Sequence, residues 1–145
     1  MDLAGLEYRL VSHGPVRSAA EAAVARGVDV QDLVKTIVVR RGDDDFLFVL
    51  VPGDRAISWP KLRSLLDVSR MSLPDAQTAK EATGYERGTI TPFGSLRDWP
   101  AIADERLAGR TIALGAGDHG VAAIVSADAV VGSLGGRWGD VTDPE

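Results

Sequence analysis

The sequence predicts a single domain of the α+β or mixed α/β class, built around a largely antiparallel sheet. Short apolar, β-branched segments alternate with short capped helices, and they do so without the regular strand-helix-strand repeat of a doubly wound fold. The chain has 145 residues, of which 45% are hydrophobic, so it can bury one core but not two. We therefore expect one folded unit over residues 1–135, followed by a polar, frayed tail over residues 136–145.

The first part of the chain predicts a helix and then a β-hairpin. Ser18 and Glu21 stand at capping-box spacing ahead of an alanine-rich segment, which predicts a helix that ends at Gly27. Two apolar runs then flank the turn residues 42–45, as in a hairpin. The expected elements are strands over residues 6–11, 36–40 and 46–51 and helices over residues 18–27 and 31–34.

The second part predicts three further helices and three further strands. Ser58 followed by Pro60 is typical of a helix start, because serine caps the first turn and proline is tolerated there. The leucines of that helix fall on one face, which we assign to the core. Ser126 is placed to cap a helix that ends near residue 131. The expected elements are helices from residue 58 and over residues 74–82 and 126–131, and strands around residue 102 and over residues 110–114 and 121–125.

Composition excludes several classes of function. The chain has no cysteine and only two histidines, His13 and His119, so it has neither a thiolate metal site nor a multi-histidine zinc site. We expect no metal and no cofactor. No apolar run approaches the roughly 18 to 20 residues that span a bilayer, and the first residues lack the pattern of a secretion signal. We therefore expect a cytoplasmic protein that does not contact a membrane.

The charge balance is mildly acidic, with 16 lysines and arginines against 21 aspartates and glutamates. Thirteen of the cations are arginine, which suits bidentate recognition of phosphate, but they are scattered along the chain. This pattern argues against tight, non-specific binding of nucleic acid and leaves open a transient contact with one strand end.

Residues 115–120 match the G-x-G-x-x-G pattern of dinucleotide-binding proteins. That fingerprint must open a helix, whereas residues 121–125 are more typical of a strand. The sequence therefore favours a hairpin turn at this place over a nucleotide site. The motifs of serine hydrolases, P-loop proteins and zinc proteases are absent from the sequence.

Lys35 is one of only three lysines and lies between Val34 and the apolar strand that follows. One interpretation is that its ammonium enters a semi-enclosed pocket, where it orients or polarises a substrate oxygen. The other is that its stem packs while its charge reaches water, and the sequence alone favours this second interpretation.

Other candidate residues also have two interpretations. The glycine- and proline-punctuated segment 88–94 can offer main-chain N–H groups to a carbonyl or phosphate, or it can be a simple turn. His119 can face a cleft as a base or bond its own backbone. Trp59, Phe93 and Trp99 can stack on a base, although packing is the more common role.

Five segments in order carry a resemblance to a known family. They are residues 32–39 with a Lys-Thr pair, 49–54 with a Pro-Gly-Asp turn, 83–94 with Thr-Gly-Tyr and a G-x-x-x-P loop at 88–92, 102–105, and 115–120. Together they resemble the YbaK/prolyl-tRNA-editing family of INS-like aminoacyl-tRNA deacylase domains. The resemblance covers residues 6–134, and the five segments in register are more specific than any one of them.

The resemblance implies a curved mixed sheet flanked by helices, and hydrolysis of the ester that joins a wrong, small amino acid to a transfer RNA, chiefly tRNA for proline. Lys35 matches the family's characteristic lysine and is the implied catalytic residue. Ile90 and Phe93 are candidate pocket walls. The implied substrate-binding residues are Gly88, Thr89, Ile90, Thr91, Pro92, Phe93, Gly94, Gly117 and His119.

The chain departs from the family pattern at the late turn. Several relatives carry an aspartate or histidine where this chain has Ala122, and relatives that clear cysteine begin the turn with serine where this chain has Gly115. Both differences argue against specificity for cysteine. His119, three positions before Ala122, is a candidate to supply a compensating polar group.

We therefore expect a free-standing, metal-independent deacylase that binds the acceptor end of mischarged tRNA, as a monomer or a weak homodimer. An aminoacyl-tRNA synthetase is a second candidate partner. Arg40, Arg87 and Arg137 are candidates for the local positive potential that RNA requires. The alternative is a non-catalytic module of the same fold that binds an aminoacyl or nucleotide ligand, or a synthetase.

Overall fold

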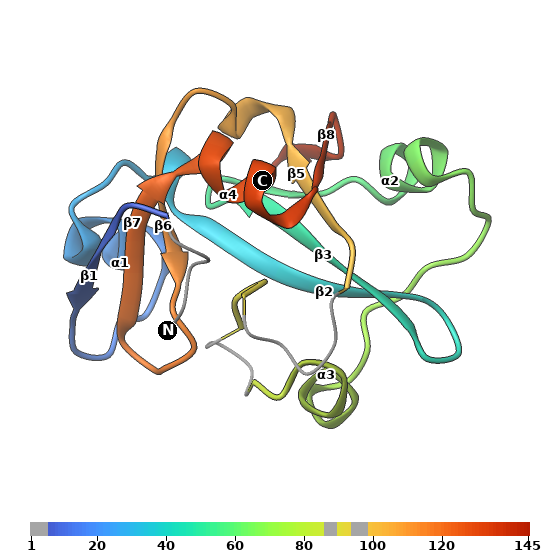
Figure 1. Cartoon of the computed structure of the whole chain (residues 1–145), viewed down its shortest axis with the longest axis horizontal. Coiled ribbons are helices and arrows are strands. Elements are labelled where there is room, and N and C mark those ends of the chain that lie inside the picture. Colours follow the sequence, from blue (N-terminus) through green and yellow to red (C-terminus); the bar gives the residue numbers. More distant parts are fainter. Residues whose placement is uncertain (1–5, 86–89, 94–98) are drawn as a thin grey trace.

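Three β-sheets organise the part of the chain that a computed structural model describes, residues 6–85, 90–93 and 99–145 (Figure 1). The antiparallel sheet β1-β7-β6 contains β1 (Tyr8–Ser12), β6 (Thr111–Gly115) and β7 (Val121–Ser126). The mixed sheet β2-β3-β5-β8 contains β2 (Val34–Gly42), β3 (Asp45–Pro52), β5 (Ala101–Asp104) and β8 (Arg137–Gly139). The third sheet pairs β4 (Arg55–Ile57) with β9 (Thr142–Pro144).

Four α-helices lie around these sheets in the described residues: α1 (Ala19–Arg26), α2 (Trp59–Leu66), α3 (Ala76–Thr83) and α4 (Ala127–Leu134). The predicted caps are confirmed, because Ser18, Ser58 and Ser126 each accept a hydrogen bond from a main-chain N–H of the first turn. One helix begins later than predicted, since the cap of α3 is Asp75. The helix predicted over residues 31–34 is a single 3-10 turn, Val30–Asp32, because β2 already begins at Val34.

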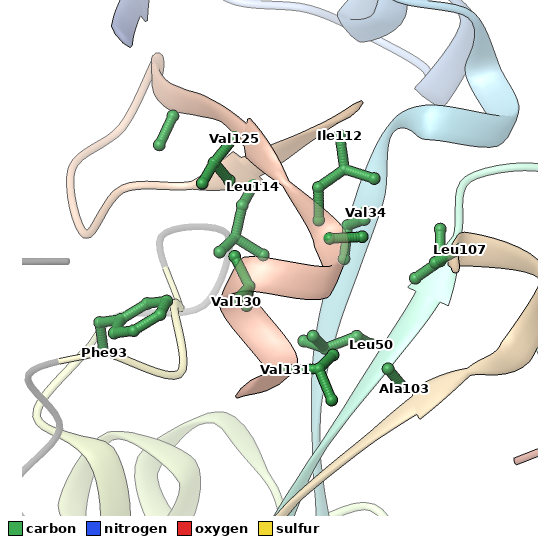
Figure 2. Close-up of a cluster of buried hydrophobic side chains, with 12 residues drawn as sticks. Val34, Leu50, Phe93, Ala103, Leu107, Ile112, Leu114, Val125, Val130 and Val131 are labelled. Carbon is green, nitrogen blue, oxygen red and sulfur yellow. The ribbon is translucent and has the colours of Figure 1, made fainter. Parts of the chain in front are cut away.

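The central hairpin β2–β3 is buried on both faces. On one face, which we call the α3/α4 face, Val34 and Leu50 pack with α4, and Val38 and Phe48 pack near Ala82 of α3. Figure 2 shows the α4 part of this cluster. Such two-sided burial explains why the strand over residues 46–51 is continuously apolar instead of alternating.

The opposite face of the hairpin, the α2 face, packs against the leucines of α2. Val39, Val49 and Val51 form a cluster there with the fully buried Leu62. The prediction that this helix turns its apolar side to the core is therefore confirmed. In Figure 1, α2 and α3 lie on opposite sides of the hairpin.

The last ten residues correct the sequence prediction. They are not a frayed tail, because β8 extends the mixed sheet beside β5 and β9 pairs with β4. Val141 and Thr142 are fully buried. The carboxylate of the buried Asp104 accepts hydrogen bonds from the Thr142 hydroxyl at 2.7 Å, from Val141 N at 3.3 Å and from Arg106 N at 3.0 Å. The prediction was wrong because it rested on the polar composition of this segment alone. The strands that pair with β8 and β9 lie far away in the sequence and give no local signal.

None of the helices in the described residues is long and apolar enough to cross a membrane.

We predict that Asp104→Ala lowers the free energy of unfolding by about 2 to 4 kcal/mol, because it leaves several buried donors without an acceptor. Urea denaturation measures the loss. The matched control is Glu105→Ala, the adjacent and exposed acid, for which we expect a change within about 0.5 kcal/mol. Equal stability of the two variants would show that Asp104 does not hold the C-terminal strands.

Candidate functional site

A pocket of about 550 Å³ lies along the edge of β2 and is mainly apolar. One wall is the strand itself, through Thr36, Ile37 and Val38. The other wall comes from the connection between α2 and α3, from Ala79 of α3 and from Ile90. Its size and its apolar lining with few polar groups are typical of a small-molecule site.

The backbone of β2 presents hydrogen-bonding groups along this edge. Arg40 exchanges two main-chain hydrogen bonds with Ser72, at 2.8 and 3.0 Å, on the side of β2 away from β3. Peptide groups alternate in direction along an antiparallel strand, so those of Val38 and Thr36 point to the same side as those of Arg40. The edge that lines the pocket therefore carries main-chain donors and acceptors that β3 does not use.

Two hydroxyl groups are buried near this edge without a hydrogen-bond partner in the described residues. They are Oγ1 of Thr36, which belongs to the pocket lining, and Oγ1 of Thr91, a fully buried residue in the segment 90–93. Buried hydroxyl groups normally have a partner, so unpaired ones are candidates to bind a ligand. In the sequence Thr36 was visible only as part of the Lys-Thr pair and carried no predicted role. The available signal was the alternation of side chains along a strand, which places Thr36 on the face opposite to Lys35.

Lys35 is on the other face of β2. Its ammonium donates hydrogen bonds to the main-chain oxygen of Arg55 at 2.5 Å and to Glu145 Oε1 at 2.9 Å. Because successive side chains of a strand point to opposite faces, Lys35 and Thr36 cannot both point to one side. Lys35 is not among the residues that line the pocket of Thr36 and Ile90.

The late glycine turn joins β6 to β7 as an antiparallel hairpin, which confirms the predicted turn. Val121 begins a strand instead of a helix, so residues 115–120 do not form a dinucleotide-binding fingerprint. Gly117 has a φ of +91°, and a Cβ atom there would lie 3.0 Å from Cε1 of Tyr85. Glycine is therefore required where the ring of Tyr85 meets the turn.

Tyr85 links this turn to the segment 90–93. Its hydroxyl donates a hydrogen bond of 2.5 Å to the main-chain oxygen of Phe93, while its ring lies against Gly117. Burial raises the pKa of the Tyr85 phenol, and the negative charge of Asp118 raises it further. Tyr85 therefore stays a neutral donor at physiological pH. In the sequence it was visible only as part of the Thr-Gly-Tyr motif.

The remaining candidates lie in different environments. Ile90 lines the pocket, whereas Phe93 packs in the core beside Leu114 and Val130 (Figure 2). Pro92 is buried, and His119 is exposed in the late turn. The predicted residues Gly88, Thr89 and Gly94, and also Arg87, lie outside the described residues.

The two candidate stacking tryptophans are packed. Trp59 lies against the core cluster of the α2 face, and Trp99 makes an edge contact with Phe46 at 5.2 Å between ring centroids. Among the described residues, no group of three or more histidine, aspartate or glutamate side chains could hold a metal ion.

Comparison with known proteins identifies the family. The chain matches the model of the aminoacyl-tRNA editing domain over residues 13–131. It is 35% identical over 79 residues to the proline-tRNA ligase of Caldicellulosiruptor saccharolyticus, a match that covers 54% of this chain but only 14% of the ligase. It is 22% identical over 140 residues to EbsC of Enterococcus faecalis, named as a candidate Cys-tRNA(Pro)/Cys-tRNA(Cys) deacylase, with 96% of this chain and 85% of EbsC covered.

A solved structure shows the same fold. The crystal structure of a candidate trans-editing enzyme for prolyl tRNA synthetase superposes with a TM-score of 0.86 and 24% identity, and the match covers 94% of this chain and 87% of that one. The predicted mixed α+β fold is therefore confirmed. Because the editing-domain match extends over most of the sequence and includes every residue of the β2 pocket, the chain belongs to the aminoacyl-tRNA editing domain family.

Proposed function

We propose that this protein is an aminoacyl-tRNA deacylase, which hydrolyses the ester between a wrong, small amino acid and a transfer RNA, with tRNA for proline as the first candidate. The observation that carries the proposal is that the editing-domain match, residues 13–131, contains the whole lining of the β2 pocket. The names of EbsC and of the proline-tRNA ligases support the same substrate class.

The chemistry needs no covalent nucleophile, because an aminoacyl ester is already activated. Water attacks the carbonyl carbon, the bond to the ribose oxygen breaks, and that oxygen takes up a proton. The carbonyl oxygen gains negative charge in the transition state, and fixed hydrogen-bond donors there supply most of the rate enhancement. The Thr36 hydroxyl and the outward N–H groups of Thr36 and Val38 are donors of this kind at the pocket. The resemblance to the family implies further main-chain donors from Gly88, which lies outside the described residues.

Lys35 is proposed to hold the RNA end on the other face of the same strand. Its partner Glu145 has a side chain that is 55% exposed, and its own side chain is 30% exposed. An ion pair with that exposure contributes little to stability, so a substrate phosphate or carbonyl group can replace Glu145. Lys35 and Thr36 then act on the substrate from the two faces of one strand.

Selection of the amino acid is proposed to be steric. The apolar walls formed by Val38, Ala79 and Ile90 admit a small side chain and exclude a large one. Favourable contact with one methylene group changes the binding free energy of the transition state by only about 1 to 3 kcal/mol. Discrimination between amino acids therefore depends on steric exclusion of the larger side chains.

We predict that wild-type protein clears at least one of Ala-, Cys-, Ser- and Thr-tRNA in a deacylation time course, with no effect of a chelator.

Thr36→Val keeps the shape of the side chain but removes the hydroxyl, and it should lower kcat/KM on the cleared substrate by roughly 10²-fold. Thr36→Ser is the matched control and should retain most of the activity. Lys35→Ala should lower kcat/KM by a similar factor. If wild type leaves all four esters at the spontaneous rate, the non-catalytic binding module becomes the better hypothesis.

We also predict that Ile90→Ala broadens the substrate range, because it enlarges the pocket. Hydrolysis of Val- or Leu-tRNA, relative to Ala-tRNA, should rise by about tenfold, a change of about 1.4 kcal/mol in discrimination. Val24→Ala is the control, since Val24 is 82% exposed and lies on α1, outside the pocket. An unchanged ratio in Ile90→Ala would show that Ile90 does not limit the size of the substrate.

A further inference from the structure

A second pocket, of about 510 Å³, lies at the end of β2 beyond the first pocket, and four arginines line it. Arg40 and Arg41 come from β2, Arg63 comes from α2, and Arg70 comes from the connection that follows α2. One carboxylate, that of Asp43, is also part of the lining. Four of the thirteen arginines, which come from three separate segments, therefore lie together here in the folded chain.

Two of these arginines form no ion pair with another described residue. Arg40 pairs with Asp43 at 2.9 Å and Arg41 pairs with Asp45 at 3.0 Å. Arg63 and Arg70 have no carboxylate within 4.0 Å among the residues that the structure describes. Although the chain has a net charge of −5, the described part of the chain thus leaves two of the positive charges in this pocket without a carboxylate partner.

The arginine pocket continues the first pocket along the same two segments. β2 contributes residues 36–38 to the first pocket and residues 40–42 to the arginine pocket. The connection between α2 and α3 contributes residues 73–75 to the first and residues 69–72 to the second. At a rise of about 3.3 Å per strand residue, the two sites are separated by roughly 7 to 13 Å along β2.

We propose that the arginine pocket binds a phosphodiester group of the RNA strand whose aminoacylated end enters the first pocket. This inference rests on the proposed function for the identity of the RNA. The guanidinium group matches the geometry of phosphate with paired N–H donors, and its charge does not depend on pH in the working range. Binding through such contacts positions the strand without reading its sequence. It also explains how an acidic protein can hold RNA, since the positive charge is concentrated beside the reaction site.

The test measures binding of an uncharged RNA hairpin that carries the acceptor stem and its single-stranded end, by fluorescence anisotropy over a range of salt concentrations. The double variant Arg63→Gln, Arg70→Gln should raise Kd by at least tenfold at about 0.1 M salt. It should also reduce the slope of log K against log salt by roughly 1.4, as expected for two lost contacts to a single strand.

The matched control is Arg9→Gln, Arg17→Gln, which removes the same charge from two arginines that precede α1. Arg9 is on β1, which lies far from α2 at the opposite end of the molecule (Figure 1). The control should leave Kd within about twofold of wild type. Equal losses in the two double variants would overturn the proposal, because net charge and not the pocket would then hold the RNA. Thermal unfolding of both variants checks that they fold.

A second substrate separates this proposal from the proposed function. Aminoacyl-adenosine contains the ester but no phosphodiester. The double variant should therefore lose kcat/KM mainly on charged tRNA, by a factor at least ten times larger than its loss on aminoacyl-adenosine. If wild type hydrolyses neither substrate but binds the hairpin through Arg63 and Arg70, the proposed function fails and the phosphate site stands. If the double variant binds the hairpin as wild type does, the phosphate site is overturned.

Discussion

Both faces of the β2–β3 hairpin are covered by other parts of the chain, and this constraint determines where a ligand can reach the sheet. Apolar side chains alternate to both sides of β2, so each face requires a layer of its own. Helices α3 and α4 supply one layer, and α2 supplies the other. Both pockets along this strand are built on the edge of β2 away from β3, where β3 does not use the main-chain groups.

The edge of a strand can bind a ligand well, because the main-chain N–H and C=O groups that it does not use for pairing have fixed orientations. Donors that are already oriented need no reorganisation when charge develops on a carbonyl oxygen. The connection between α2 and α3 reaches the edge at Ser72, pairs with Arg40, and thereby separates the apolar pocket from the arginine pocket. One pairing thus gives two neighbouring environments, one suited to a small side chain and one suited to phosphate.

The C-terminal strands and the late turn stabilise the surroundings of this edge from different sides. Asp104 accepts hydrogen bonds from Thr142 of β9 and from Val141 just before it, and Glu145, directly after β9, accepts a hydrogen bond from the ammonium of Lys35. On the other side Tyr85 holds the segment 90–93 against the glycine turn. Apart from the Tyr85–Phe93 hydrogen bond, these contacts join residues that are more than 30 positions apart in the sequence, so the pocket walls depend on the completed fold.

The four α-helices, the β2–β3 and β6–β7 hairpins and the family could be predicted from the sequence, because caps such as Ser18 and Ser126, turn residues and apolar periodicity are local signals. The surroundings of each face of β2 could not be predicted in this way: Thr36 belongs to the pocket, while Lys35 lies toward β9. The tertiary structure decided them, and it also decided that the polar C-terminal residues form strands. The physical reason is the same in each case. Strand partners and the layers that cover a sheet are set by long-range packing, which leaves no signal within a short stretch of sequence.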